Sequence, residues 1–241
     1  MRCNDFQLSS ASPDPHSRQE AANYPDDAVP WLIGDARKVI DLGAGTGKLT
    51  RSLLGLVGDV VALEPEHSMA QRLTEVVTGV RAVCARAEAL PVRGGWADVV
   101  VVAQAFHWFD QSRALPEIAR VLKPHGRLGL VWNVRDQSID WVTALSKITG
   151  GDNSEQTRFV MKQLLHFEQI ESRTFRSAQP LDRDTLIAHV HSRSHVAALD
   201  EVDRQKMTDA VLRLCDTHRD LVGKSRFALP YVTQAFRANR S

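Results

Sequence analysis

The glycine-rich turn after residues 38–42 constrains this chain more than any other stretch. The sequence Lys-Val-Ile-Asp-Leu is a short apolar segment, and glycines follow at alternate positions, Gly43, Gly45 and Gly47. Glycine adopts positive φ at no steric cost and lets a ligand approach where a Cβ would clash. The residues after the turn favour a helix, whose first N–H groups lack partners within the helix and can face a ligand. The pattern predicts a strand, a tight turn and a helix N-terminus at a binding site.

Two acidic residues accompany this turn. Asp41 stands shortly before the first glycine, and Glu64 ends a second apolar segment that begins at Val60. A carboxylate about 20 residues beyond such a turn is placed to accept hydrogen bonds from a ribose. The glycine spacing is Gly-x-Gly-x-Gly, whereas dinucleotide-binding folds use Gly-x-Gly-x-x-Gly. The motif therefore indicates a ligand that contains a ribose, and its spacing disfavours a nicotinamide dinucleotide.

With these motifs the chain resembles the class I S-adenosylmethionine-dependent methyltransferases, in particular the small-molecule, type 11-like group. The resemblance extends from about residue 24 to the C-terminus. It implies that Asp41 holds the amino end of S-adenosyl-L-methionine, that the glycines approach its methionine and ribose portions, and that Glu64 binds the ribose hydroxyls. The full set of cofactor-binding residues that we expect is Asp41, Gly43, Ala44, Gly45, Gly47, Glu64, Pro65, Ala87, Glu88 and Gln104.

Two parts of the chain depart from the family pattern. Arg86 stands in the turn after the third predicted strand, where many relatives carry an acid. The resemblance then assigns adenine recognition to the Ala87 backbone, with Arg86 stacking. Near the N-terminus, relatives fold an aromatic segment over the cofactor, and only Tyr24-Pro25 is recognisable here. A packing role and a functional role for Tyr24 both stay open.

Apolar segments alternate with helical patterns over the first half of the chain. Residues 99–103 are Val-Val-Val-Val-Ala, an unbroken β-branched run typical of a parallel strand covered by helices on both faces. Five such strands predict a doubly wound, mostly parallel α/β sheet. The resemblance extends this to a Rossmann-like seven-stranded sheet with a reversed C-terminal strand. The last two strands are expected at Phe167 to about Ser177 and at Tyr231–Phe236.

We expect one methyltransferase domain over residues 1–241, with residues 1–22 flexible. Helical patterns over Asp182–Val196 and Asp203–Cys215 predict a small helical cap at about 182–217. Two further helices are predicted earlier in the chain, one around Trp141, Leu145 and Ile148 and one around Met161, Leu164 and Leu165.

The acceptor side of the site is expected directly after the valine-rich strand. Phe106, His107 and Trp108 follow it, and ligands of such sheets bind beyond the carboxyl ends of the strands. Methyl transfer from a sulfonium needs mainly positioning of donor and acceptor. His107 is a candidate general base for a hydroxyl or carboxyl acceptor, with a hydrogen-bonded structural histidine as the alternative. Phe106 and Trp108 are either walls of an apolar substrate pocket or packing residues of the sheet edge.

On the predicted cap, Arg193 is a candidate substrate-binding residue. Arginine pairs well with carboxylates, so Arg193 suits an anionic acceptor. His189, His191 and His195 surround it in sequence, but on a helix their spacing distributes them over different faces. We therefore expect no metal site.

Composition limits the partners that we expect. The 30 Lys and Arg residues balance 29 Asp and Glu residues to a net charge of +1, which gives no electrostatic case for nucleic acid. No apolar run approaches membrane-spanning length, and the polar N-terminal residues lack the apolar core of a signal peptide. Scattered cysteines indicate free thiols. We expect a cytoplasmic protein with a small-molecule substrate and no nucleic-acid or membrane partner; its oligomeric state stays open.

The sequence thus predicts an enzyme that uses S-adenosyl-L-methionine to methylate a small organic acceptor, with a hydroxyl or carboxyl oxygen as one candidate for the methylated atom. A non-catalytic protein that binds S-adenosylmethionine is an alternative, because Arg86 and the N-terminal segment depart from the family pattern. A nicotinamide-dependent oxidoreductase on the same sheet is a second alternative, which the glycine spacing disfavours.

Overall fold

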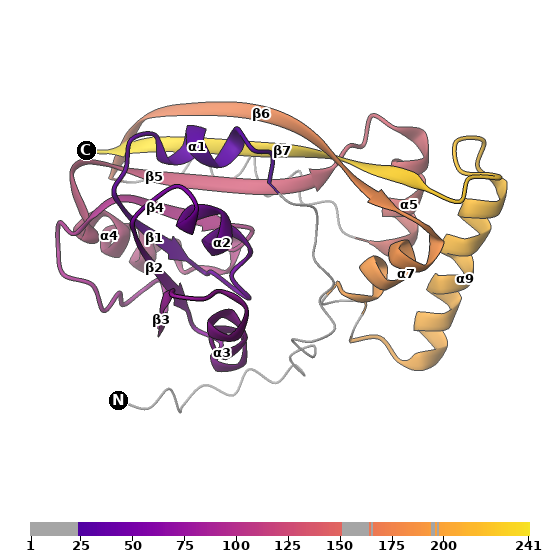
Figure 1. Cartoon of the computed structure of the whole chain (residues 1–241), viewed down its shortest axis with the longest axis horizontal. Coiled ribbons are helices and arrows are strands. Elements are labelled where there is room, and N and C mark those ends of the chain that lie inside the picture. Colours follow the sequence, from indigo (N-terminus) through magenta and orange to yellow (C-terminus); the bar gives the residue numbers. More distant parts are fainter. Residues whose placement is uncertain (1–23, 151–163, 165, 194–195, 197) are drawn as a thin grey trace. The chain divides into compact units, whose positions relative to one another are not determined.

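The computed structural model describes residues 24–150, 164, 166–193, 196 and 198–241 (Figure 1). These residues form two compact units, which are described separately. The sheet unit comprises Tyr24–Asn133, the described part of Ser154–Phe175, and Thr233–Ser241. The helical unit comprises the described parts of Val134–Asn153 and Arg176–Val232.

A seven-stranded sheet is the central element of the fold, with the strand order β3-β2-β1-β4-β5-β7-β6. The first five strands are parallel, whereas β7 is antiparallel to its neighbours β5 and β6. The predicted fold class, including the reversed C-terminal strand, is confirmed. The strands are β1 (Lys38–Leu42), β2 (Asp59–Glu64), β3 (Arg81–Cys84), β4 (Ala97–Ala103), β5 (Leu122–Arg135), β6 (Phe167–Leu181) and β7 (Phe227–Arg240).

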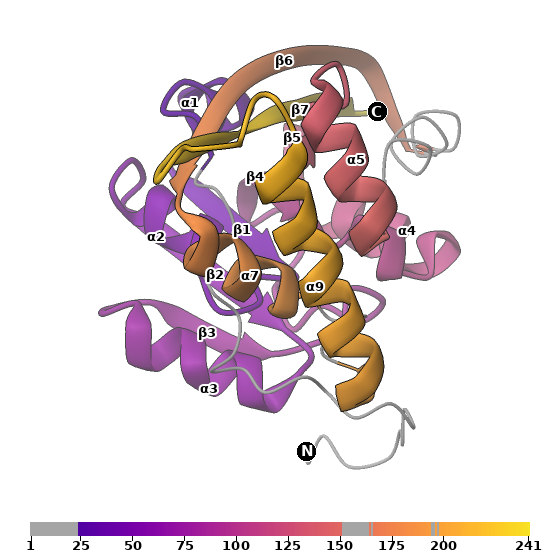
Figure 2. The same cartoon turned by 90° about the vertical axis from the view of Figure 1, so that its right-hand side faces the viewer.

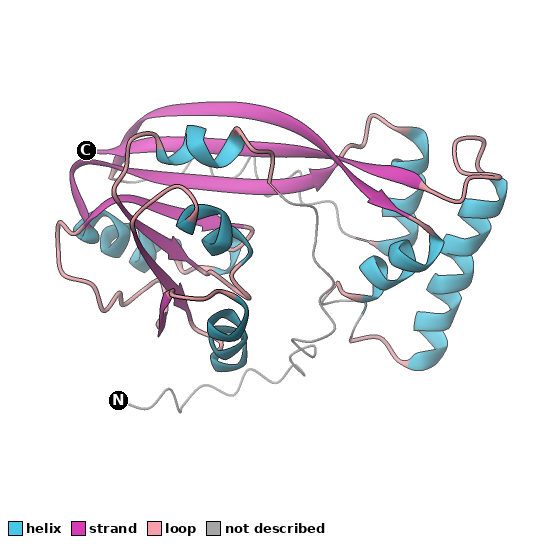
Figure 3. Ribbon diagram, viewed as in Figure 1, coloured by secondary structure: helices cyan, strands magenta, loops and turns pink. Residues whose placement is uncertain are grey.

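Strands and helices alternate along the sheet unit (Figure 3). The helices are α1 (Ala28–Ile33), α2 (Lys48–Leu54), α3 (His67–Val76), the short 3₁₀ helix η2 (Phe106–Trp108) and α4 (Gln111–Val121). The parallel register pairs Leu42 of β1 with Leu63 of β2 and Asp41 with Val101 of β4. Because these strands are parallel, their carboxyl ends lie at the same edge of the sheet. This edge carries the glycine turn after β1, Glu64 at the end of β2 and the residues that follow Ala103 of β4.

Both faces of the sheet are buried, as the valine run predicts. On one face, β1, β2 and β4 pack against residues of α1 and α2; Val39, Val99 and Val101 belong to this cluster. Successive side chains of a strand point to opposite faces, so Val100 and Val102 point the other way. Both are fully buried as well.

The helical unit packs α5 (Asp140–Thr149), α7 (Arg183–His191) and α9 (Glu201–Thr217) around its own apolar core. Helix α9 packs against both α5 and α7 (Figure 2). Helix α7 begins with a capping box, in which Asp182 accepts from the Thr185 N–H at 2.8 Å and Thr185 accepts from the Asp182 N–H at 2.8 Å. Such a box satisfies two N–H groups that a helix leaves unpaired.

Several element boundaries differ from the expected ones. Strand β7 spans Phe227–Arg240, well beyond the predicted Tyr231–Phe236. It continues through Pro230 because proline still offers a carbonyl, which accepts from the Asp136 N–H at 3.0 Å. Helix α7 ends at His191, before the predicted end at Val196, and the Ser192 hydroxyl bonds the His189 carbonyl at 2.8 Å. The helix expected around Met161–Leu165 and the flexible segment 1–22 lie outside the described residues, except for Leu164.

Candidate functional site

The glycine turn between β1 and α2 has the conformation that its sequence predicts. Gly43, Gly45 and Gly47 all have positive φ, at 72°, 58° and 86°. The N–H groups of Gly43 and Ala44 both donate to the Leu63 carbonyl, at 2.8 and 3.1 Å, which fixes the turn to the end of β2. The turn is therefore held by backbone contacts of the neighbouring strand.

The three glycines meet different surroundings. A Cβ on Gly43 would lie 2.6 Å from the Ala105 Cβ, and one on Gly47 would lie 2.7 Å from the Val77 Cγ2. A Cβ on Gly45 would meet no described atom within 4 Å. Packing therefore excludes side chains at Gly43 and Gly47, whereas Gly45 faces open space at the turn.

Glu64 braces this turn through both carboxylate oxygens. The Gly45 N–H donates to Oε2 at 2.8 Å, and the Glu66 N–H donates to Oε1 at 3.0 Å. The residue is only 7% exposed. A carboxylate oxygen can accept more than one hydrogen bond, so a Glu64 oxygen that already accepts from a backbone N–H can also accept from a ligand. The predicted ribose contact therefore remains open to it, and the sequence did not predict that Glu64 also orders the turn.

Asp41 is a fully buried carboxyl group that is only half satisfied. Its Oδ2 accepts from the Thr50 hydroxyl at 2.6 Å, and its Oδ1 has no partner among the described residues. Burial is the main cause that raises the pKa of Asp41 to about 7; the Thr50 hydrogen bond opposes this rise, and nearby Glu64 adds to it. Sequence reasoning missed Thr50, whose only signal is a hydroxyl in the first turn of α2.

Tyr24 lies near Asp41, and Lys48 lies near the Tyr24 ring. Burial, followed by the charge of Asp41, raises the pKa of the Tyr24 hydroxyl. The Lys48 Nζ lies 6.0 Å from the centre of the Tyr24 ring, a cation–π distance. The sequence left Tyr24 between packing and function, and the structure places it next to a predicted cofactor-binding residue.

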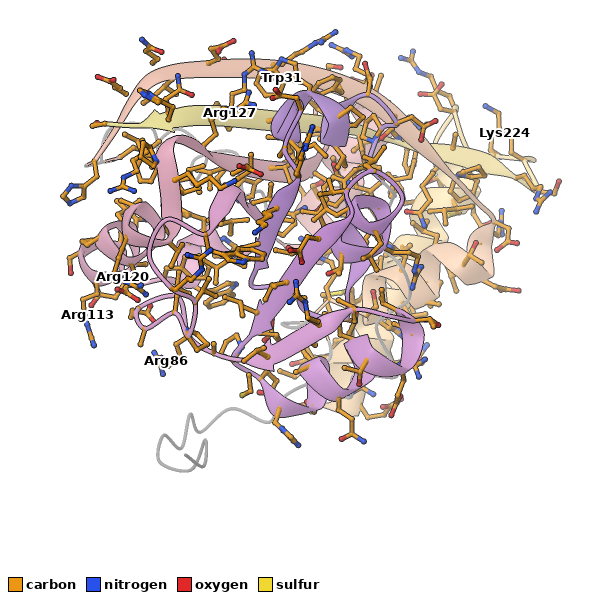
Figure 4. The ribbon with its side chains drawn as sticks, turned by 60° about the vertical axis from the view of Figure 1, so that its left-hand side comes forward. Trp31, Arg86, Arg113, Arg120, Arg127 and Lys224 are labelled. Atoms are coloured by element: carbon orange, nitrogen blue, oxygen red, sulfur yellow. The ribbon has the colours of Figure 1, made fainter. Side chains whose placement is uncertain are left out.

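The turn after β3 approaches the end of β2. The Ala85 N–H donates to the Glu64 carbonyl at 3.2 Å, and Ala87 is buried. Glu88 accepts from the Asp110 N–H at 2.9 Å and pairs with the exposed Arg86 at 3.4 Å. Arg86 points outward on the same side of the unit as Arg113 of α4 (Figure 4). The Glu88 carboxylate therefore fixes this loop to the N-terminus of α4.

Gln104 directly follows β4 and has a strained conformation. Its φ of 57° is positive, which is uncommon for a residue with a side chain. Its Nε2 donates to the Asn133 carbonyl at 3.0 Å, and its N–H donates to the Val131 carbonyl at 3.0 Å. Such strain persists only where surrounding contacts impose it, and it is frequent at ligand-binding sites.

The predicted acceptor-side residues that follow Gln104 differ in how far they are buried. Phe106 is fully buried and packs on Phe109, with ring centres 5.8 Å apart, whereas Trp108 is 79% exposed. The His107 ring lies 4.8 Å from the Trp108 ring, and its buried Nδ1 has no partner among the described residues. Burial lowers the pKa of His107, so the ring is neutral near pH 7 and able to accept a proton. The roles of these three residues in substrate binding and catalysis stay predictions.

Arg193 lies in the helical unit, beside Tyr231. Burial lowers the pKa of Arg193, and the nearby Tyr231 hydroxyl opposes that shift. His189 bonds Tyr231 and His191 bonds Thr208, so these two histidines face different partners. Among the described residues, no group of His, Cys, Asp and Glu side chains has the arrangement of a metal site. No described helix combines the length and apolar character needed to cross a bilayer.

Comparison with known proteins reveals similarity over the whole chain. Residues 40–130 match a family model described as a methyltransferase domain. The chain is 39% identical over 242 residues to a protein of Mycobacterium tuberculosis described as an uncharacterized methyltransferase, and the match covers 99% of both chains. A Schizosaccharomyces pombe protein described as an uncharacterized methyltransferase-like protein is 30% identical over 229 residues, with 90% of both chains covered.

A solved structure of similar fold comes from Anaeromyxobacter dehalogenans and is described as that of a candidate type II methyltransferase. It superimposes with a TM-score of 0.73 at 22% sequence identity, over 92% of this chain and 98% of the other. At this level of identity the likeness establishes the fold alone.

Proposed function

Because the chain belongs to the class I S-adenosylmethionine-dependent methyltransferases, we propose that it moves the methyl group of S-adenosylmethionine to a small organic molecule. The observation that carries this proposal is the half-satisfied Asp41 beside the open Gly45 turn. The following residues of the sheet unit account for cofactor binding.

Asp41 suits the amino end of the cofactor. Its Oδ1 is a buried acceptor without a partner among the described residues, and its pKa is about 7. A cationic amino group at this atom would supply the missing hydrogen bond and would lower the pKa of the carboxyl group. The Asp41 carboxyl group therefore suits an ammonium group bound at the end of β1.

The turn suits the rest of the cofactor. Gly45 faces space in which a ligand can approach the backbone. Glu64 accepts from the Gly45 N–H, and a carboxylate can accept hydrogen bonds from ribose hydroxyls as well. The remaining proposed contacts are Gly43, Ala44, Gly47, Pro65, Ala87, Glu88 and Gln104. This arrangement binds a nucleoside between the glycine turn and the end of β2.

S-adenosylmethionine, when bound, supplies a methyl group already activated on a sulfonium. The protein then needs to orient the acceptor and to accept a proton where the acceptor atom carries one. We propose His107 for the second task, because its lowered pKa keeps the ring neutral. A hydroxyl oxygen needs such a base, whereas an ionised carboxylate does not.

We also propose a cytoplasmic location and a small-molecule acceptor. Cys215 is a free thiol, which is typical of proteins from reducing compartments. The chain's net charge of +1 offers nothing to attract a polyanion such as nucleic acid.

Turnover tests the proposal. The purified chain is incubated with S-adenosylmethionine and a panel of small phenols, alcohols and carboxylic acids, and S-adenosylhomocysteine is quantified by mass spectrometry. We expect acceptor-dependent formation of S-adenosylhomocysteine, which His107→Asn slows for hydroxyl acceptors. Binding of S-adenosylmethionine without turnover on any acceptor would favour the non-catalytic alternative instead.

A further inference from the structure

The helical unit contains a buried group of polar side chains near Arg193, for which the sequence predicts a role in binding an anionic acceptor. The Asp136 N–H donates to the Pro230 carbonyl at 3.0 Å, so the antiparallel register of β5 and β7 places Arg135 opposite Tyr231. Directly opposed residues project to the same face of a sheet. Tyr231 bonds the His189 Nε2 at 3.0 Å, which ties this pair to helix α7.

The Arg135 guanidinium is buried and only partly satisfied. The residue is 6% exposed, and its Nη1 donates to the Thr149 hydroxyl at 2.8 Å. Its Nε and Nη2 have no hydrogen-bond partner among the described residues. These two nitrogens form one edge of the guanidinium, which carries two parallel N–H groups that match the two oxygens of a carboxylate.

The electrostatic surroundings of Arg135 favour an anion. The pKa of Arg135 is lowered to about 10, mainly by burial and then by the charge of Arg193, whereas the Tyr231 hydroxyl opposes both effects. No carboxylate of a described residue contributes to the pKa of Arg135. The adjacent Asp136 is engaged elsewhere, because its carboxylate accepts from Ser138 and from Arg176. A buried cation without a counter-charge is costly, and a bound anion removes that cost.

We propose that Arg135, Arg193 and Tyr231 bind the carboxylate of a small organic acid. The Nε–Nη2 edge of Arg135 binds both carboxylate oxygens, Arg193 adds a second positive charge, and Tyr231 offers its hydroxyl. His189 positions that hydroxyl through its hydrogen bond. The planar two-donor edge favours a carboxylate over a tetrahedral phosphate or sulfate. The proposal goes beyond methyl transfer, since the binding needs no methyl donor.

Calorimetric titration of the full chain with malonate tests this site. We expect wild-type protein to bind malonate and to ignore malonamide, its uncharged analogue. Arg135→Lys keeps the charge but loses the two-donor edge, so we expect affinity to fall about tenfold or more. Tyr231→Phe removes only a hydroxyl and should weaken binding by a smaller factor. Arg176→Lys is the matched control, because Arg176 is exposed on β6 of the same unit and should leave affinity unchanged.

Three outcomes would overturn the proposal. The first is the absence of a malonate signal in folded wild-type protein. The second is unchanged malonate affinity in both Arg135→Lys and Tyr231→Phe, with folding of each variant verified by circular dichroism. The third is binding of inorganic phosphate or sulfate as tight as that of malonate at equal ionic strength, which would indicate a general anion site.

Discussion

At the scale of single residues, Asp41 has the most unusual environment of the candidate site. It is fully buried, hydrogen-bonded through one oxygen only, and has a pKa of about 7 against an ordinary value of 3.8. The folded protein therefore holds a proton on this group over a pH range in which the unfolded chain has released it. Stability is then lost as the pH rises between these two values.

The pH dependence of stability checks this environment. Asp41→Asn keeps the shape of the side chain and removes the titration. We expect the free energy of unfolding of the wild type, measured relative to Asp41→Asn, to be about 2–3 kcal/mol lower at pH 8 than at pH 5. Urea denaturation of both proteins at the two pH values measures this difference in the free energy of unfolding. An equal difference at both pH values would mean that the pKa of Asp41 is not raised.

The glycines of the turn allow a paired test. Gly43→Ala and Gly45→Ala both place a side chain at positive φ, which costs about 1–2 kcal/mol. Only Gly43→Ala also brings a Cβ to 2.6 Å from the Ala105 Cβ. We expect Gly43→Ala to lower the free energy of unfolding by clearly more than Gly45→Ala does, as measured in urea. Equal losses would contradict the different surroundings that the structure gives the two glycines.

At the scale of elements, helix α1 is tied to the reversed strand β7 by one arginine. Arg237 lies 4.6 Å from the centre of the Trp31 ring and donates to the Trp31 carbonyl at 3.0 Å. It also pairs with Glu171 of β6 at 2.8 Å. Figure 4 shows Trp31 on α1 above this part of the sheet unit. The contact joins residues from opposite ends of the chain.

We expect Arg237→Ala to lower the free energy of unfolding by about 1–3 kcal/mol, because it removes a cation–π contact and charge-assisted hydrogen bonds. Arg173→Ala is the control, since Arg173 is exposed and lies 4.9 Å from the Phe175 ring. The control should cost less than about 1 kcal/mol. Thermal or urea unfolding of both variants measures the difference, and equal losses would show that Arg237 does not tie α1 to the sheet.

Elements were easier to predict than their ends or their long-range contacts. The valine run 99–103 and the Gly43–Gly47 turn have local patterns that few other folds accommodate, so the sheet and its glycine turn followed from them. Strand β7 was predicted too short, because hydrogen bonding through Pro230 depends on a partner strand far away in sequence. Arg135 and Tyr231 lie opposite each other because of the strand register, which a local sequence pattern does not determine.

At the scale of the whole molecule, the sheet unit holds the proposed cofactor-binding residues and the helical unit holds the proposed carboxylate-binding residues. The sheet unit brings Asp41, the glycines and Glu64 together as the sequence predicts, and it adds Thr50 and Tyr24 beside them. The helical unit holds Arg193 together with Arg135, whose importance the sequence did not signal. That both units act as one methyltransferase domain stays a prediction.

The measurement that tests the central claim most directly is calorimetric titration of S-adenosylmethionine into the wild type, Gly45→Val and Glu64→Ala. Gly45→Val fills the open side of the turn, and Glu64→Ala removes both the brace of the turn and the ribose acceptor. We predict micromolar binding by the wild type and its loss in both variants, with circular dichroism showing that all three proteins are folded. Absence of binding by folded wild-type protein would contradict the assignment of this turn as a methyl-donor site.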